Sequence, residues 1–176
     1  MVVLKCLILI KMNIDEAIEI LKKEIENPNV GLPEKIFEFA SSILPIVSTE
    51  LLIKDENNRT LLTWRVNKCS GNGWHIPGGL LRFKETLKQR IEKTSWGEVG
   101  ALVTYDPTPI RIEQVIDKNQ DTRGHAICFL YKCFLPSDFI PYNGVKKEHD
   151  EGYVKWFDKC PEDLLSWHEI YRRYIL

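Results

Sequence analysis

Residues 73–101 read GWHIPGGLLRFKETLKQRIEKTSWGEVGA, and this stretch carries the strongest indication of fold and chemistry in the chain. Its adjacent glycines, Gly78 and Gly79, let the backbone approach a ligand closely because neither has a Cβ. The helix that we expect from about Thr86 to Val99 ends with Glu98, whose carboxylate can reach back along the helix face. A carboxylate beside exposed backbone carbonyls forms an oxygen-rich site that suits Mg²⁺, which keeps several waters and bridges substrate phosphates.

The bulk composition predicts a soluble globular protein. The 176 residues suit one domain with a short extension. Hydrophobic residues make up 44% of the chain and charged residues 28%, which is an ordinary balance. The formal net charge of −1 argues against a nucleic-acid partner, because binding to nucleic acid requires many phosphate-neutralising cations. A small anionic ligand needs only a few local cations and stays compatible with this charge.

The cysteines and the first residues indicate a cytoplasmic protein without a membrane partner. The five cysteines form no Cys-x-x-Cys pair, which argues against a zinc site or a disulfide framework and favours a reducing compartment. The apolar run MVVLKCLILI at residues 1–10 is too short to span a bilayer and lacks a small-residue cleavage site. It is either a strand or a segment before the true start at Met12, and the sequence leaves both readings open.

Two helices are expected ahead of the main domain. Asn13 is a suitable N-cap for the first, whose apolar stripe ends near Pro28. The second is expected to start at Pro33 and to stop before Pro45, because the residue before a proline disfavours helical geometry. We interpret residues 1–44 as an N-terminal helical extension.

Residues 45–176 alternate strands and helices. The turn DENNR at residues 55–59 separates two expected strands, Ile46–Lys54 and Thr60–Val66, and so predicts a hairpin. Gly100 is expected as the C′ residue of the helix that contains Glu98. Further strands are expected at Ile110–Ile116, His125–Leu135 and Val154–Phe157, with a last helix that begins at Pro161 and has Arg172 and Arg173 near its end. This order predicts an α+β domain in which a mixed sheet lies between helical layers (α/β/α).

Residues 79–101 resemble a Nudix box, which is a glycine, five residues, a glutamate, seven residues and an Arg-Glu-hydrophobic-x-Glu-Glu-x-Gly-hydrophobic ending. The standard box helix presents three carboxylates to metal, and this chain retains only Glu98. Lys93 stands where the box has arginine, and Thr94 and Gly97 stand where it has glutamates. The positions in register are Gly79, Glu85, Glu98, Gly100 and Ala101.

The missing glutamates leave two readings open. In the first, the domain binds a nucleotide without turnover. In the second, the chain resembles the GDP-mannose mannosyl hydrolase branch of the Nudix hydrolases, in which the same two glutamates are replaced. We favour the second reading because the resemblance continues through PIVSTELLIKDENNRTLLTWR at residues 45–65 and EHDEGYVKW at residues 148–156.

This resemblance implies a Nudix fold and a Mg²⁺-dependent hydrolase, with Mn²⁺ as an alternative cation. Its substrate would be a nucleoside-diphosphate derivative, namely a nucleotide sugar such as GDP-mannose. Water would attack the anomeric carbon, and the nucleoside diphosphate and the sugar would be released. The resemblance also suggests a homodimer. Two alternatives remain, which are a general Nudix pyrophosphatase that gives two monophosphates and a non-catalytic nucleotide sensor.

The resemblance also assigns the reacting groups. It implies that the metal is held by Glu98, a backbone carbonyl near Gly78 and Glu148. His149 would act as general base, since the pKa of an unperturbed histidine lies near working pH. Arg65 would neutralise the leaving diphosphate, a task that suits the guanidinium fork. The alternative for Glu148 and His149 is a charged loop that serves only solubility.

The remaining candidates bind substrate or support the box. Glu50 matches an acidic residue of the branch that contacts the nucleotide region. Leu80 replaces an arginine of the branch, and Arg82 or Arg90 is expected to compensate for it. Glu85 is expected to pair with Lys93, since eight residues place the two on one side of a helix. Gly79 and Gly100 complete the structural part of the box.

Overall fold

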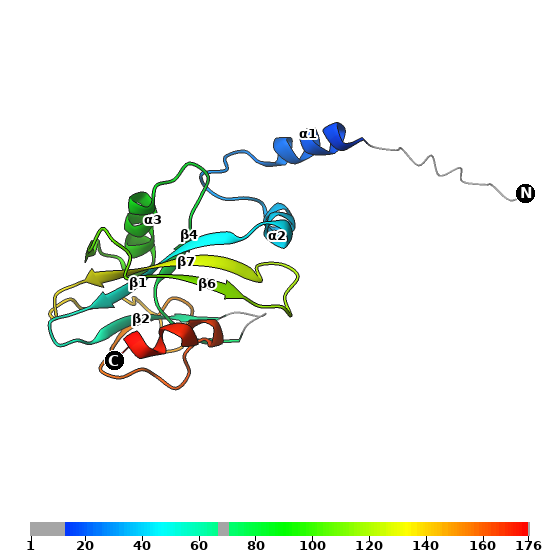
Figure 1. Ribbon diagram of the computed structural model, residues 1–176. Coiled ribbons are helices and arrows are strands. Elements are labelled where there is room, and N and C mark those ends of the chain that lie inside the picture. The colour runs from blue at the N-terminus through cyan, green and yellow to red at the C-terminus, as the bar shows by residue number, and fades with distance from the viewer. Residues whose placement is uncertain (1–12, 67–70, 176) are drawn as a thin grey trace, which may run out of the picture.

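The computed structural model describes residues 13–66 and 71–175, and Figure 1 shows their arrangement. A mixed sheet runs through the molecule in the order β3-β2-β1-β7-β5, with β4 paired to β1, β6 to β7 and β8 to β2. The strands are β1 (Ile46–Lys54), β2 (Thr60–Arg65), β3 (Gly73–His75), β4 (Gly78–Leu80), β5 (Thr104–Tyr105), β6 (Arg111–Ile116), β7 (His125–Phe134) and β8 (Val154–Phe157).

Helical segments lie on both sides of this sheet. In Figure 1, α3 lies on one side and the C-terminal helical segment η2 on the other, so the expected α+β class with a sheet between helices is confirmed. The helix α1 extends away from the body. The helical segments are α1 (Ile14–Glu24), α2 (Glu34–Ile43), α3 (Leu87–Thr94), the π-helical segment η1 (Ser95–Val99) and the 3₁₀ segment η2 (Ser166–Tyr174).

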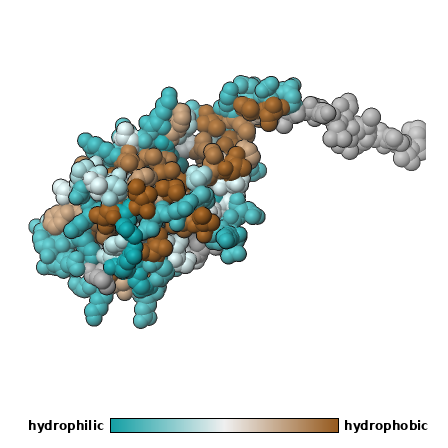
Figure 2. Space-filling view, viewed as in Figure 1, coloured by the Kyte–Doolittle hydropathy of each residue, from teal (hydrophilic) through white to brown (hydrophobic). Residues whose placement is uncertain are grey.

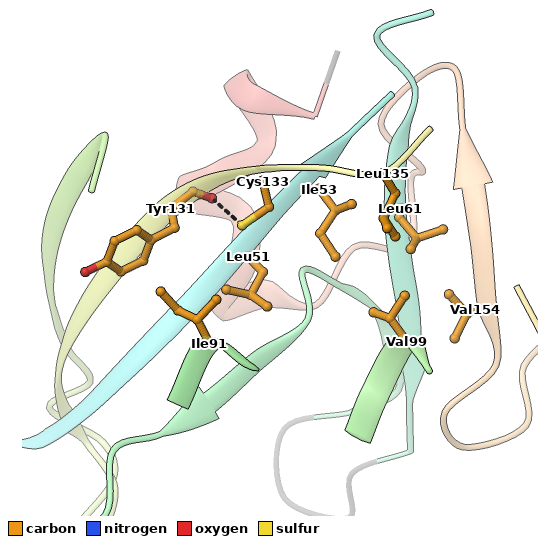
Figure 3. Packing of buried hydrophobic residues seen from close by; sticks show 9 residues of the cluster. All are labelled: Leu51, Ile53, Leu61, Ile91, Val99, Tyr131, Cys133, Leu135 and Val154. Carbon is orange, nitrogen blue, oxygen red and sulfur yellow. Dashed lines mark hydrogen bonds between the residues drawn. The ribbon is translucent and has the colours of Figure 1, made fainter. Parts of the chain in front are cut away.

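The central strand β1 separates two hydrophobic cores. It runs parallel to β7 and antiparallel to β4, with Glu50 opposite both Leu130 and Gly78. Successive side chains of a strand point to opposite faces, so Leu51 and Leu52 enter different cores. Figure 3 shows the core on the α3 side, where Ile91 and Val99 point toward the strand side chains. The other core lies against η2.

Local sequence signals locate the first elements well. Asn13 caps α1 with a capping box, in which Glu16 returns a hydrogen bond to the Asn13 backbone amide. The strands β1 and β8 have the expected bounds. The helix that contains Glu98 ends as a π-helical segment, and Gly100 follows in the left-handed conformation with φ of 77°. Figure 2 shows apolar side chains gathered around α1 and α2, where Ile14, Phe39 and Ile43 are exposed.

The expectation that the last helix begins at Pro161 is wrong, because regular helical structure starts at Ser166 and is of the 3₁₀ type. Tertiary pairing explains the delay. The Trp74 amide donates to the Asp163 carbonyl at 2.9 Å, and the Leu165 amide donates to the Trp74 carbonyl at 2.9 Å. These bonds hold the segment as a bridge beside β3 and prevent a helical turn there. The strands β3, β4 and β5 were not expected from the sequence.

Among the described helices, none is long and apolar enough to cross a membrane. The two readings of residues 1–10 and the proposed start at Met12 fall outside the described residues.

Candidate functional site

The candidate site forms where the glycine strand β4 pairs with β1. Gly78 lies opposite Glu50, and a Cβ added to Gly78 would meet Glu50 Oε2 at 2.2 Å. A Cβ added to Gly79 would meet Thr94 Oγ1 at 2.3 Å. The two glycines therefore allow a carboxylate on one side and a helix on the other to approach the same short strand closely.

Glu98 reaches this glycine turn from the end of the α3–η1 helix. The Gly78 amide donates a hydrogen bond to the Glu98 carboxylate. Thr63 Oγ1 lies 3.3 Å from Glu98 Oε2 and 2.7 Å from His75 Nε2. Glu98 thus points toward the glycine turn at Gly78, where the resemblance to the Nudix box predicts a metal ligand.

His75 orients the Thr63 hydroxyl. His75 Nδ1 lies 2.8 Å from the Ile76 carbonyl, which can only accept, so this nitrogen carries the proton. Burial first, and then the charge of Arg65, lower the pKa of His75 well below its usual value, so the ring is neutral and its Nε2 is an acceptor. The Thr63 hydroxyl therefore lies between two acceptors, His75 Nε2 and the Glu98 carboxylate, and its donation to Glu98 favours the ionised form of that carboxyl.

Two carboxyls with raised pKa share the site. Burial first, and also the neighbouring charge of Glu98, raise the pKa of Glu50 to about 8. Burial also raises the pKa of Glu98 to about 7. Arg65 counteracts burial in both cases by favouring the ionised form. Buried carboxyls that repel each other beside a cation are typical of functional sites.

Arg65 lies at the end of β2 with its guanidinium available to a ligand. Within residues 13–66 and 71–175 no hydrogen bond or ion pair engages this guanidinium, although its charge acts on Glu50, Glu98 and His168. It also lines a cavity of about 200 Å³ together with Ser48 and Tyr171. An arginine in this position can bind a phosphate with two parallel hydrogen bonds.

The loop that contains Glu148 and His149 lies beside the other face of β2. Glu148 Oε1 accepts a hydrogen bond from Lys155 Nζ at 2.7 Å. The His149 ring packs against Trp64 with a centroid distance of 4.3 Å, and its Nε2 lies 3.9 Å from Asp163 Oδ2. In the described part of the chain no contact joins either residue to Glu50 or Glu98.

Glu151 is a residue of this loop that the sequence reasoning missed. Its Oε2 accepts a hydrogen bond from the Val66 amide, just beyond Arg65. Its charge contributes to the raised pKa of Glu98. The signal was present in the run EHDEG, but three acidic residues in five give no basis for choosing among them without the fold.

The other box residues form the frame of the site. Glu85 accepts hydrogen bonds from the Arg82 amide at 3.0 Å, from Arg90 Nε at 2.7 Å and from Lys93 Nζ at 2.9 Å. The Arg82 guanidinium lies beside Gly31, in a groove next to α2 and not beside the carboxyl pair.

Thr94 and Gly97, which replace two glutamates of the box, differ in their surroundings. Thr94 is buried against Gly79, whereas Gly97 is exposed and has open space where a Cβ would lie.

The carboxyl pair fits a hard divalent cation. No group of three or more His, Cys, Asp or Glu side chains within the described residues could hold a metal ion. Glu98 nevertheless supplies oxygen ligands, and a bound cation would relieve its repulsion with Glu50. Mg²⁺ is usually bound by one or two carboxylates and completes its coordination with water and substrate phosphates.

The comparisons with known proteins agree on the fold. No protein-family model matches the chain. The low-salt glycan biosynthesis protein Agl8 of Haloferax volcanii is 28% identical over 154 residues, which cover 85% of this chain and 94% of the relative. The MutT Nudix hydrolase of Burkholderia pseudomallei superposes with a TM-score of 0.57 at 20% identity, over 76% of this chain and 99% of that one.

A third similarity concerns a protein that was solved with ligands. A bifunctional NMN adenylyltransferase/ADP-ribose pyrophosphatase from Francisella tularensis, complexed with AMP and a manganese ion, superposes with a TM-score of 0.50 at 18% identity. The match covers 71% of this chain and 39% of that one. Together these structures show that the chain has the Nudix fold, as the sequence predicts.

Proposed function

We propose that the chain is a Mg²⁺-dependent hydrolase of a nucleoside-diphosphate derivative and that its substrate is a nucleotide sugar. The observation that carries the proposal is the meeting of Glu50 and Glu98 at Gly78, with Arg65 close to both carboxyls. The Nudix hydrolases that share the fold support hydrolysis, and the neighbour solved with AMP and manganese supports a nucleotide and a divalent cation. The relative named for glycan biosynthesis favours a substrate that carries a sugar.

In this proposal Glu98 and a backbone carbonyl near Gly78 hold the cation. The bound cation would neutralise the diphosphate and stabilise it as a leaving group. Arg65 contributes to the same end, since its guanidinium can form two hydrogen bonds to phosphate oxygens as negative charge develops on them. Mn²⁺ would be accepted in place of Mg²⁺, because oxygen ligands suit both ions.

Glu50 is better placed than His149 to accept the proton of the attacking water. The pKa of Glu50, raised to about 8, lies close to working pH, which favours general-base catalysis. Ser48 Oγ donates a hydrogen bond to Glu50 Oε1 at 2.8 Å, which leaves Oε2 above Gly78 for the water. The role of general base that the sequence suggests for His149 is therefore the second assignment, because the His149 ring packs against Trp64.

Product labelling in ¹⁸O-water tests the reaction. The protein is incubated with GDP-mannose or other nucleotide sugars and Mg²⁺, and the products are identified by mass spectrometry. We expect the label in the free sugar, as attack at the anomeric carbon requires. Label in a monophosphate would instead support the pyrophosphatase alternative, which the neighbour named as an ADP-ribose pyrophosphatase favours. Nucleotide binding without any product would support the sensor.

A matched pair of glutamate variants tests the cation site. Glu98→Gln keeps the shape of the side chain but removes its charge, and we expect it to lower turnover by about 10²–10³-fold. Glu92→Gln alters a glutamate on the same helix whose carboxylate, among the described residues, pairs with Lys88 alone at 3.9 Å, and it should retain activity. Equal activity in both variants would refute the assignment of Glu98. Sedimentation velocity would test the homodimer that belongs to the same proposal.

A further inference from the structure

A cavity of about 200 Å³ opens beside the carboxyl pair and continues the site away from the cation. Arg65 lines it, and so does Ser48, whose hydroxyl also holds Glu50. The cavity is therefore contiguous with the place where the diphosphate is proposed to bind. Its walls come from α2, from the turn between β6 and β7 and from η2, and the lining residues used below are Phe37, Ile46, Leu80, Arg123, Trp167, His168 and Tyr171.

The walls of this cavity suit a flat heterocycle. Trp167 and Tyr171 contribute aromatic surface from η2, and Ile46 and Leu80 contribute aliphatic surface from β1 and β4. Such a slot buries the two apolar faces of a base favourably. The polar groups of the same cavity, which include Ser48, Arg65 and His168, can bind the hydrogen-bonding edge of the base.

His168 adds a hydrogen-bond donor to the cavity. The residue is 7% exposed, and its Nδ1 accepts a hydrogen bond from the Ile76 amide at 3.3 Å. Burial first, and then the charge of Arg65, lower the pKa of His168 to about 3, so the ring is neutral at working pH. The proton of the neutral ring must therefore be on Nε2, which can donate to a ring nitrogen or a carbonyl of a base.

The helix α2 is fixed as one wall by Arg123. The Arg123 guanidinium forms an ion pair with Glu34 and lies over the Phe37 ring, 4.8 Å from its centroid. The Arg123 amide donates to Ser41 Oγ at 3.2 Å. Phe37 thus faces the cavity between α2 and the β6–β7 turn. The helix belongs to the N-terminal extension, which lies outside the Nudix resemblance.

We propose that this cavity binds the base of the nucleoside diphosphate and that α2, through Phe37, is a wall of the binding site. The proposal rests on the proposed function, because Arg65 is taken to bind the diphosphate between the base and the cation. It gives the N-terminal extension a role in substrate recognition.

Binding without turnover tests this proposal. Dissociation constants of GDP, ADP, UDP and inorganic pyrophosphate are measured by calorimetry in the presence of Mg²⁺. We expect Phe37→Ala to weaken binding of the preferred nucleoside diphosphate by about tenfold, which corresponds to about 1.4 kcal/mol, and to leave pyrophosphate binding unchanged. Phe39→Ala is the matched control, since Phe39 lies on the same helix but is 56% exposed and does not line the cavity.

The outcomes separate this inference from the proposed function. If nucleoside diphosphates bind but both phenylalanine variants behave alike, the base pocket is refuted, while turnover by the wild type and its loss in Glu98→Gln are unaffected. If nucleoside diphosphates bind no more tightly than pyrophosphate, the base pocket is refuted as well. Should Phe37→Ala fail to fold, photo-cross-linking of the wild type with an azido-substituted nucleoside diphosphate decides. Labelled peptides from α2 or η2 support the pocket, and labels elsewhere refute it.

Discussion

Arg65 connects the three parts of the candidate site. Its positive charge favours the ionised forms of Glu50 and Glu98 and disfavours protonation of His168. The Arg65 side chain also lines the base cavity. A guanidinium is suited to this position because it stays charged when partly desolvated and can bind phosphate with a planar fork. A lysine would keep the charge but lose the fork.

We expect Arg65→Gln to lower kcat/KM by roughly 10²-fold and Arg65→Lys to lower it by a smaller factor. Initial rates with the substrate found by labelling measure both effects. Arg111→Gln is the control, because Arg111 is exposed on β6 and, in the part of the chain that the structure describes, pairs with Glu113 alone at 3.4 Å. Wild-type rates in Arg65→Gln would show that the leaving group is stabilised by other groups.

Two single residues, Glu50 and His149, are the candidates for the general base. Because the pKa of Glu50 lies at about 8 and its Oε2 faces the glycine strand, we expect Glu50→Gln to lower kcat by about 10²–10⁴-fold. His149→Ala should lower kcat by less than about fivefold, since that ring packs against Trp64. Single-turnover rates distinguish the two, and the reverse order of effects would restore the assignment of His149.

Among the elements, we expect the short strand β4 to tolerate amino-acid substitution least. It pairs with β1 through Ser48, Thr49 and Glu50, so any side chain at its glycines enters a space that is already filled. Glu85 lies between β4 and the helix α3, and it forms ion pairs with Arg90 and Lys93 of that helix. These ion pairs keep α3 close to β4. The position of Glu98 relative to Gly78 therefore depends on strand pairing and on the placement of the helix together.

We expect Gly78→Ala to destabilise the fold by about 1–3 kcal/mol and to weaken Mg²⁺ binding, because the added Cβ overlaps Glu50. Gly97→Ala provides a control within the same box, as a Cβ there would meet open space. Replacing that helical glycine should be neutral or stabilise by up to about 1 kcal/mol. Denaturant titration and Mg²⁺ calorimetry measure both variants. Equal stability of the two would contradict the close packing of β4 on β1.

For the whole molecule, the buried carboxyls make stability depend on pH. The folded pKa values of Glu50 and Glu98 are about 8 and about 7, both above the value of 4.5 expected in the unfolded chain. The folded state therefore binds more protons than the unfolded state between these values, and the free energy of unfolding falls as pH rises. His75 and His168, with lowered pKa values, act in the opposite sense below about pH 6.5.

Between about pH 6.5 and 8 the carboxyl effect dominates. We expect the metal-free protein to lose about 2 kcal/mol of stability between pH 6.5 and 8, seen as a fall in Tm of several degrees. Mg²⁺ should raise Tm more at pH 8 than at pH 6, since its site gains negative charge as the two carboxyls ionise. Glu50→Gln should remove most of the decline. A Tm that stays constant over this range in the wild type would show that the two carboxyls ionise normally.

Much of the fold followed from local patterns in the sequence. Alternation predicted β1 and β8, an N-cap predicted the start of α1, and Gly100 marked the end of the box helix. Each of these features depends on residues that lie a few positions apart in the sequence, so a local pattern is enough to predict it. The last helix was misplaced because bonds between Trp74 and residues 163–165, far apart in the chain, override the helix-start signal of Pro161.

The sequence by itself determined the fold class and the candidate groups Glu50, Arg65 and Glu98. Only the tertiary structure decided that these three lie together while Glu148 pairs with Lys155. The reason is strand register: a shift of one residue between β1 and β4 would turn the facing side chains to the other side of the sheet. Register is set by packing across the whole domain, which no local pattern specifies.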